Sequence, residues 1–155
     1  MGKNKTKELA VLAVLTALSV VLAYIHLPTP TGYLTLLDTG IYFTAFYLGS
    51  QSGAVVGGLS GFLIDLLLGY PHYMIYSLIA HGLQGFFAGW KGKKRLLGIL
   101  LAGVAMVGSY FAAALLLGYG WGAAWAGIWG NIAQNILGLS AGGFTYLAYR
   151  RSGKR

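Results

Sequence analysis

Long apolar runs, separated by short breaks of glycine, proline and charged residues, dominate this chain. A helix that crosses a bilayer needs roughly 20 mostly apolar residues. The runs are continuously apolar, whereas strands of a membrane barrel alternate between apolar and polar positions. We therefore predict an all-α polytopic membrane protein with a single domain, residues 1–155. Its bundle of six transmembrane helices is expected at about residues 8–25, 36–49, 53–69, 72–90, 95–118 and 123–149.

The composition narrows the class of protein further. Only 9% of the residues are charged and 57% are hydrophobic, whereas a soluble domain carries about a quarter charged residues. This balance excludes an ordinary water-soluble enzyme, a disordered tail and a conventional nucleic-acid-binding protein. The chain contains no cysteine, which excludes disulfides and thiolate metal sites.

The basic residues test the predicted topology. All 11 lysines and arginines lie in the first few residues, at residues 91–95, or in the last six residues. In a six-helix protein these three places share one side of the membrane. Because cytoplasmic loops carry the excess of lysine and arginine, we predict a multi-pass protein of the bacterial plasma membrane with both termini in the cytoplasm. The net charge then reflects topology in a lipid bilayer, and no nucleic-acid partner is expected.

Small residues recur at helical spacing. Helices in lipid associate through close packing of such residues. Glycines are spaced by four at positions 49, 53, 57 and 61, at 85 and 89, and at 138 and 142, and we expect them to pack the helices of this chain together. In the first predicted helix, Ala10, Ala13 and Ala17 lie on one face. This stripe either packs inside the bundle or docks a separate subunit.

Several polar side chains lie inside the apolar runs, where burial is unfavourable unless they form hydrogen bonds. Either these groups bond one another and hold the bundle, or they line a pocket. The many aromatic residues suit stacking on a flat heterocycle and favour a small pocket with apolar walls. The candidates from the fourth, fifth and sixth predicted helices are Tyr73, His81, Gln84, Tyr110, Trp129, Asn131 and Asn135.

The chain has three acidic residues, of which Asp38 and Asp65 fall toward the predicted outer face. Asp38 opens the second predicted helix, where the structural role of an aspartate is an N-cap. Each of the two either binds donors of a ligand or satisfies backbone amides. No phosphate-binding loop or zinc-protease motif is present, and His81, the candidate base of a membrane enzyme, has no nucleophile or metal partner. We therefore expect no enzymatic activity, cofactor or metal.

Two segments resemble a known family. Residues 30–40, with the sequence Pro-Thr-Gly-Tyr-Leu-Thr-Leu-Leu-Asp-Thr-Gly, are followed at 47–73 by a glycine-rich helix that ends in Ile-Asp-Leu-Leu-Leu-Gly-Tyr-Pro-His-Tyr. Together with the length and the six-helix layout, these segments resemble the substrate-binding S components of energy-coupling factor (ECF) vitamin transporters. The resemblance is to the riboflavin-type group, which includes the proposed hydroxymethylpyrimidine and pyridoxine members.

This resemblance implies a high-affinity vitamin binder that works with an EcfT-type transmembrane coupling subunit and two cytosolic ATPases. It implies that residues 26–36 act as an outer lid, and that the alanines at 10, 13 and 17 dock the coupling subunit. Tyr33 of the lid and Asp38 join the candidate binding residues. The neutral aromatic and amide groups favour pyridoxine or hydroxymethylpyrimidine as substrate, with pantothenate or riboflavin as alternatives. A stand-alone channel or secondary transporter is the alternative of a different class.

Overall fold

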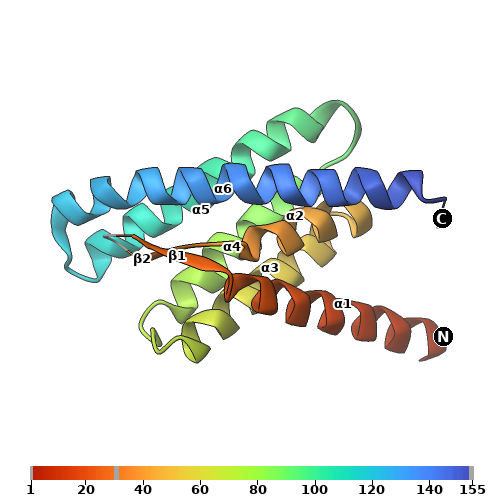
Figure 1. Ribbon diagram of the computed structural model, residues 1–155, viewed down its shortest axis with the longest axis horizontal. Coiled ribbons are helices and arrows are strands. Elements are labelled where there is room, and N and C mark those ends of the chain that lie inside the picture. Colours follow the sequence, from red (N-terminus) through yellow and green to blue (C-terminus); the bar gives the residue numbers. More distant parts are fainter. Residues whose placement is uncertain (1, 30–31, 154–155) are drawn as a thin grey trace.

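The computed structural model describes residues 2–29 and 32–153. Six α-helices form a membrane-type bundle, as the apolar runs predict, and both termini lie at the same end of the molecule (Figure 1). The helices are α1 (Gly2–Ala23), α2 (Leu37–Leu48), α3 (Ser50–Leu67), α4 (Met74–Ala88), α5 (Arg95–Leu116) and α6 (Gly120–Arg151). A short 3-10 turn, η1 (Gly92–Lys94), precedes α5, and two strands, β1 (His26–Thr29) and β2 (Gly32–Thr35), connect α1 to α2.

The helices differ in length more than the apolar runs indicate. Helix α2 has 12 residues, and at 1.5 Å per residue it spans about 18 Å, less than the roughly 30 Å hydrocarbon core. Gly49, with φ of 98°, is the single residue between α2 and α3. Residues 50–52, which the expected bounds leave between two helices, therefore belong to α3. Helix α6 is longer than expected, with 32 residues.

Three segments of the described chain are long and apolar enough to cross a membrane: Lys5–Ala23, Ser50–Leu67 and Gly92–Leu116. Helix α4 is apolar but shorter, with 15 residues. Helix α6 has sufficient length, but amide side chains at 131, 134 and 135 interrupt its apolar sequence. The bundle thus combines full-length spans with helices whose polar groups need partners inside the protein.

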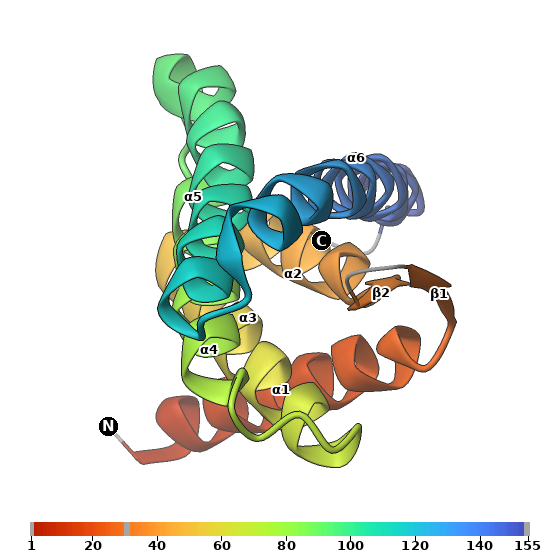
Figure 2. The same cartoon turned by 90° about the vertical axis from the view of Figure 1, so that its left-hand side faces the viewer.

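The connection between α1 and α2 is an antiparallel β-hairpin, whereas the two prolines of residues 26–32 predict a turn-rich loop. His26 pairs with Thr35, and Thr29 pairs with Gly32; residues 30 and 31 of the expected lid lie outside the described part of the chain. The Leu36 N–H continues the ladder by donating to the carbonyl oxygen of Ile25 at 3.3 Å. Figure 2 shows the hairpin on the side of α1 and α6, across the bundle from α5.

The spaced glycines pack helices against one another, as their spacing predicts. A Cβ atom at Gly53 would lie 2.5 Å from the carbonyl oxygen of Gly85, and one at Gly61 would lie 2.7 Å from that of Ser77. Between them, a Cβ atom at Gly57 would overlap the carbonyl oxygen of His81. Helices α3 and α4 therefore approach backbone to backbone, which places His81 at the centre of the bundle. Gly138 and Gly142 of α6 bring that helix close to α2 in the same way.

Helix α1 contacts the bundle through one face only. Ser19, Val20 and Ala23 are buried on that face, and Ser19 lies against Gly40 of α2. The alanines at positions 10, 13 and 17 are all exposed. Packing inside this chain therefore does not explain the alanine stripe, and the surface that it forms is free in the described structure.

Candidate functional site

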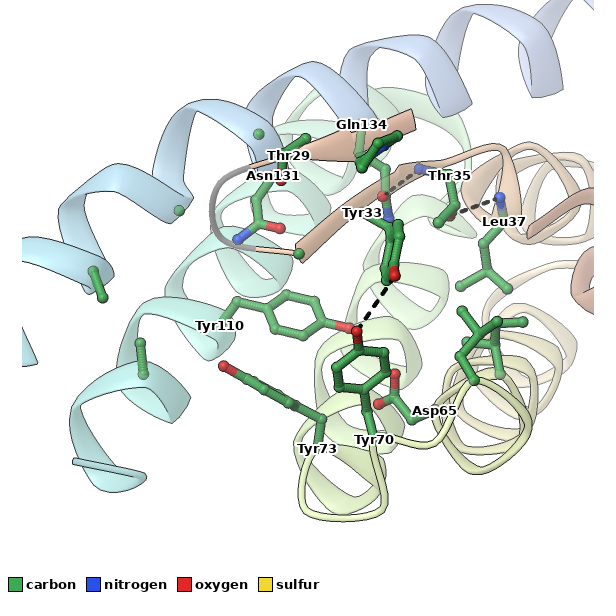
Figure 3. Close-up of a pocket in the computed structure, with 18 of the residues that line it drawn as sticks. Thr29, Tyr33, Thr35, Leu37, Asp65, Tyr70, Tyr73, Tyr110, Asn131 and Gln134 are labelled. Carbon is green, nitrogen blue, oxygen red and sulfur yellow. Dashed lines mark hydrogen bonds between the residues drawn. The ribbon is translucent and has the colours of Figure 1, made fainter. Parts of the chain in front are cut away.

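A cavity of about 560 Å³ lies beneath the hairpin, at the end of the bundle opposite the termini. Small-molecule sites typically have volumes of about 300–1,000 Å³. The hairpin, the α3–α4 connection and the facing sides of α4, α5 and α6 form its wall (Figure 3). The polar side chains of this wall are Thr29, Tyr33, Thr35, Asp65, Tyr70, His72, Tyr73, His81, Tyr110, Tyr119, Asn131 and Gln134.

Aromatic rings and small residues shape the interior. Tyr73 stacks on Tyr119 with ring centroids 6.2 Å apart and planes inclined by 15°, and its centroid lies 6.4 Å from that of Tyr110. Helix α6 contributes Ala124 and Gly127 to the wall, and their small size leaves room for a ligand. Because tyrosine faces favour offset stacking on other rings, this combination suits a flat heterocycle.

A chain of hydrogen bonds connects the cavity wall to the core of the bundle. The Tyr110 hydroxyl lies 2.6 Å from Ser77 Oγ and 3.0 Å from His81 Nε2. His81 Nδ1 lies 2.8 Å from Gln84 Oε1, and Gln84 Nε2 donates to Asp38 Oδ2 at 2.7 Å. His81, Gln84 and Asp38 are almost completely buried. Deletion of a partner here would therefore leave a polar group without compensation from water.

A second branch of hydrogen bonds connects Asp38 to the hairpin. Gln134 Nε2 donates to Asp38 Oδ1 at 3.1 Å, and Gln134 Oε1 accepts the Thr35 backbone N–H at 2.9 Å. The Thr35 hydroxyl in turn accepts the Leu37 N–H at 3.2 Å. The Asp38 carboxylate thus joins α2, α4, α6 and the base of the hairpin. The expected N-cap role of Asp38 is wrong, because the start of α2 has no side-chain cap.

The carboxylate also determines the direction of the hydrogen bonds. An ionised carboxylate only accepts, so Gln84 and Gln134 both turn their NH2 groups toward Asp38. The Gln84 oxygen is then the acceptor for His81 Nδ1–H. His81 Nδ1 also lies 3.5 Å from Asp38 Oδ1. When the imidazole is neutral, its other nitrogen is an acceptor, and in that state the Tyr110 hydroxyl donates to His81 Nε2. One acidic group thereby sets the donor and acceptor pattern up to the cavity wall.

Asp65 has a different environment. It lies at the C-terminal end of α3 and lines the cavity next to Tyr70 (Figure 3). Its Oδ2 atom is buried and has no hydrogen-bond partner among the described residues. An unsatisfied buried acceptor costs about 1–3 kcal/mol, and more when it is charged. The cavity therefore contains an unused acceptor.

The tyrosine side chains at the rim of the cavity are uncharged. The Tyr70 hydroxyl donates to that of Tyr33 at 3.4 Å, and this hydrogen bond raises the pKa of Tyr70. Burial, followed by electrostatic interactions with Tyr119 and Asp65, raises the pKa of Tyr73. No lysine or arginine lines the cavity within the described residues, and they contain no cluster of three metal-ligating side chains.

The structure brings together most of the candidate binding residues, but in two layers. Tyr33, Tyr73, His81, Tyr110 and Asn131 line the cavity. The other candidates that face inward lie behind the wall. Asp38 and Gln84 are in the hydrogen-bond network described above, and Asn135 accepts a hydrogen bond from the Tyr42 hydroxyl at 2.9 Å.

The expectation that Trp129 belongs to this wall is wrong. Its side chain is 75% exposed on the outer surface of α6. Successive helical residues are about 100° apart, so Trp129 points roughly 200° away from Asn131. Trp125 is likewise exposed, and its ring packs against Phe111.

Sequence reasoning did not select several wall residues. Gln134 lies three positions after Asn131, and this spacing places both on one face of a helix, so periodicity carried a usable signal. Tyr70 and Tyr119 lie in connections between helices, where no periodicity indicates the direction of a side chain. Thr35 takes part mainly through its backbone N–H, which any residue other than proline supplies.

The helical membrane fold and its aromatic cavity are typical of a membrane protein that holds a small molecule. A family model described as the S component of ECF-type riboflavin transporters matches residues 3–151. The chain therefore belongs to this family of ECF transporter S components, as the resemblance in its sequence predicts. It is a transporter component and not an enzyme.

The chain is also similar to three other proteins. The thiamine precursor transporter HmpT of Lactococcus lactis subsp. cremoris (strain MG1363) is 44% identical over 143 residues, which cover 90% of this chain and 85% of the relative. An uncharacterised protein of Pyrococcus woesei is 34% identical over 139 residues, 85% of this chain and 93% of the relative. A solved S component of a bacterial ECF transporter has a TM-score of 0.75 at 21% identity, covering 97% of this chain and 99% of that chain, and shares its fold.

Proposed function

We propose that this S component binds the hydroxymethylpyrimidine precursor of thiamine at high affinity and delivers it to an ATP-driven ECF uptake transporter. The observation that carries the proposal is the cavity wall, which presents tyrosine rings, amides and one unused carboxylate oxygen to a small ligand. The 44% identity to a thiamine precursor transporter supports the same class of substrate.

The charges of the wall favour a neutral substrate. Phosphate groups are normally held by arginine, lysine or helix N-termini. In this protein the basic residues gather at the opposite end, where the Arg95 guanidinium lies over the rings of Phe46 and Tyr146 and that of Arg150 lies over Tyr146. We therefore expect discrimination against phosphorylated hydroxymethylpyrimidine and against the anion pantothenate.

Direct binding tests the proposal. The purified protein in detergent is titrated with hydroxymethylpyrimidine, its phosphate ester, pyridoxine, pantothenate and riboflavin in a calorimeter. Mass spectrometry identifies small molecules that co-purify with the protein. We expect hydroxymethylpyrimidine to bind most tightly. A lack of affinity for hydroxymethylpyrimidine would refute the proposed substrate. A preference for pyridoxine would make pyridoxine the substrate of this S component instead.

The arrangement of charge supports an orientation with both termini in the cytoplasm. The termini and the basic α4–α5 connection lie at the same end of the bundle (Figure 1). Lysine and arginine accumulate on the cytoplasmic side of membrane proteins. The cavity, at the other end, would then open toward the outside of the cell, where an uptake system meets its substrate.

We propose that the exposed alanine stripe of α1 docks the transmembrane coupling subunit, which also carries the two ATPases. Small residues permit the close helix approach on which association in lipid depends, and positions 10, 13 and 17 have no role in packing this chain. The partner supplies the ATP hydrolysis, since this sequence has no phosphate-binding loop.

Bulky substitutions test the docking surface. We expect Ala17→Trp to retain hydroxymethylpyrimidine binding but to abolish ATP-dependent uptake in vesicles that contain all subunits, because the indole would separate the two helices. Val104→Trp is the matched control, since Val104 is 69% exposed on α5. Normal uptake by Ala17→Trp would refute docking through this stripe. Uptake by the chain alone would instead support a self-sufficient transporter.

A further inference from the structure

Asp38 and Asp65 differ in the hydrogen bonds that they accept. Asp38 is fully buried and accepts hydrogen bonds from two glutamine amides. Asp65 lines the cavity, and its buried Oδ2 atom has no partner among the described residues. Buried polar atoms without partners are rare in folded proteins, and each calls for an explanation. A ligand that donates a hydrogen bond to Asp65 Oδ2 would explain why this atom has no partner in the protein.

The surroundings of Asp65 limit the kind of donor. Tyr73 and Tyr110 present their rings to the cavity close to this carboxylate, and Asn131 lies farther along the wall on α6 (Figure 3). A flat ligand that stacks on the tyrosines would direct one edge of its ring to Asp65. A polar substituent on that edge, in the plane of the ring, would then reach the free oxygen.

We propose that Asp65 is a specificity-determining residue that accepts a hydrogen bond from an exocyclic amino group of the ligand, so that the site selects aminated heterocycles. This inference rests on the proposed function. The lone pair of such an amino group is delocalised into the ring, so the group only donates. A hydroxyl group both donates and accepts, and it can bond the tyrosines or Asn131 instead. An amino group needs an acceptor, and Asp65 Oδ2 is the buried acceptor of the wall that has no partner among the described residues.

The proposal separates the two substrates that the sequence leaves open. Hydroxymethylpyrimidine carries an amino group on its ring, whereas pyridoxine carries hydroxyl groups and no amino group. With Asp65 as the acceptor, hydroxymethylpyrimidine is the better ligand. Loss of a hydrogen bond to a charged group lowers affinity by about 10- to 100-fold.

The test pairs a change in the protein with a change in the ligand. Binding of hydroxymethylpyrimidine and of the analogue in which hydrogen replaces the amino group is measured by calorimetry for the wild-type protein, Asp65→Ala and Asp65→Asn. We expect the wild-type protein to prefer the aminated ligand by about 10- to 100-fold. Asp65→Ala should bind both ligands equally, and Asp65→Asn, which keeps one carbonyl acceptor, should show an intermediate preference.

The outcomes distinguish the two proposals. If the wild-type protein binds neither ligand, the proposed function itself fails. If it binds hydroxymethylpyrimidine but does not distinguish the analogue, or if Asp65→Ala keeps the full preference, the role of Asp65 alone is refuted. The thermal unfolding midpoint shows that each variant is folded, and Asp65→Asn provides the same comparison if Asp65→Ala does not fold.

Discussion

Replacement of Asp38 by alanine should destabilise this protein strongly. The carboxylate is fully buried and accepts hydrogen bonds from Gln84 Nε2 at 2.7 Å and from Gln134 Nε2 at 3.1 Å. Asp38→Ala removes both acceptors and leaves two buried amide donors unpaired. Each unpaired donor costs about 1–3 kcal/mol, so the free energy of unfolding should fall by roughly 2–6 kcal/mol.

Thermal unfolding in detergent, followed by tryptophan fluorescence, measures this effect. A chain of this size loses about 2–4 °C in Tm for each kcal/mol, so the midpoint should fall by roughly 5–20 °C. Asp65→Ala is the matched control, because the same substitution there removes a carboxylate whose Oδ2 atom has no hydrogen-bond partner among the described residues. Asp65 also interacts with the Ser77 side chain, so the midpoint of Asp65→Ala should fall less than that of Asp38→Ala. Equal losses in both variants would refute the division of roles between the two acids.

Asp38→Asn gives a finer test of the same network. Gln134 must accept the Thr35 N–H, so it still offers its NH2 group and bonds the new carboxamide oxygen. The carboxamide NH2 then faces Gln84, which has to turn its own oxygen toward it. His81 would consequently carry its hydrogen on Nε2 instead of Nδ1, a change visible in the 15N NMR shifts of the ring. An unchanged tautomer would show that Asp38 does not set the direction of the hydrogen bonds.

Two further predictions concern packing and the cavity wall. Gly57→Ala should destabilise the protein by about 1–3 kcal/mol through overpacking, since a methyl group there meets the His81 carbonyl. Gly108→Ala, in open space, should not destabilise the protein. Thermal unfolding compares the two variants, and equal midpoints would contradict the close α3–α4 contact. Asn131→Ala should weaken hydroxymethylpyrimidine binding by about 1–3 kcal/mol. Trp129→Ala, on the outer surface, should leave the dissociation constant unchanged. Weaker binding by Trp129→Ala would contradict the orientation of α6.

The helical framework was predictable because lipid imposes strong rules on sequence. Apolar length and the location of lysine and arginine are sufficient to identify helices, and glycines spaced by four indicate which helix faces pack closely. The hairpin was not predictable, because its strands have four residues each and include Pro28. Two-stranded hairpins are marginal alone, and this one is tied to Gln134, which lies 99 residues from Thr35.

The site was predictable as a set of residues but not as a set of roles. Helical periodicity brings Tyr73, His81 and Asn131 to one cavity. Periodicity alone does not identify which face of α6 points inward, so it does not show that Trp129 points outward. Asp38 and Asp65 look alike in the sequence, since each lies near a helix end among apolar residues. Their difference arises from α6, where Gln134 reaches Asp38, and only the tertiary structure contains that contact.

The way in which the hairpin is attached has a consequence for rates. Its base is fixed by the buried bond between the Thr35 N–H and Gln134, whereas Tyr33, nearer the tip, meets Tyr70 through a surface hydroxyl pair 3.4 Å apart. Exposed hydrogen bonds contribute little net free energy, about 0.5–1.5 kcal/mol. We therefore predict that the Tyr33–Tyr70 contact breaks before the Thr35–Gln134 bond when a ligand enters or leaves the cavity, a local motion that leaves the helical bundle packed.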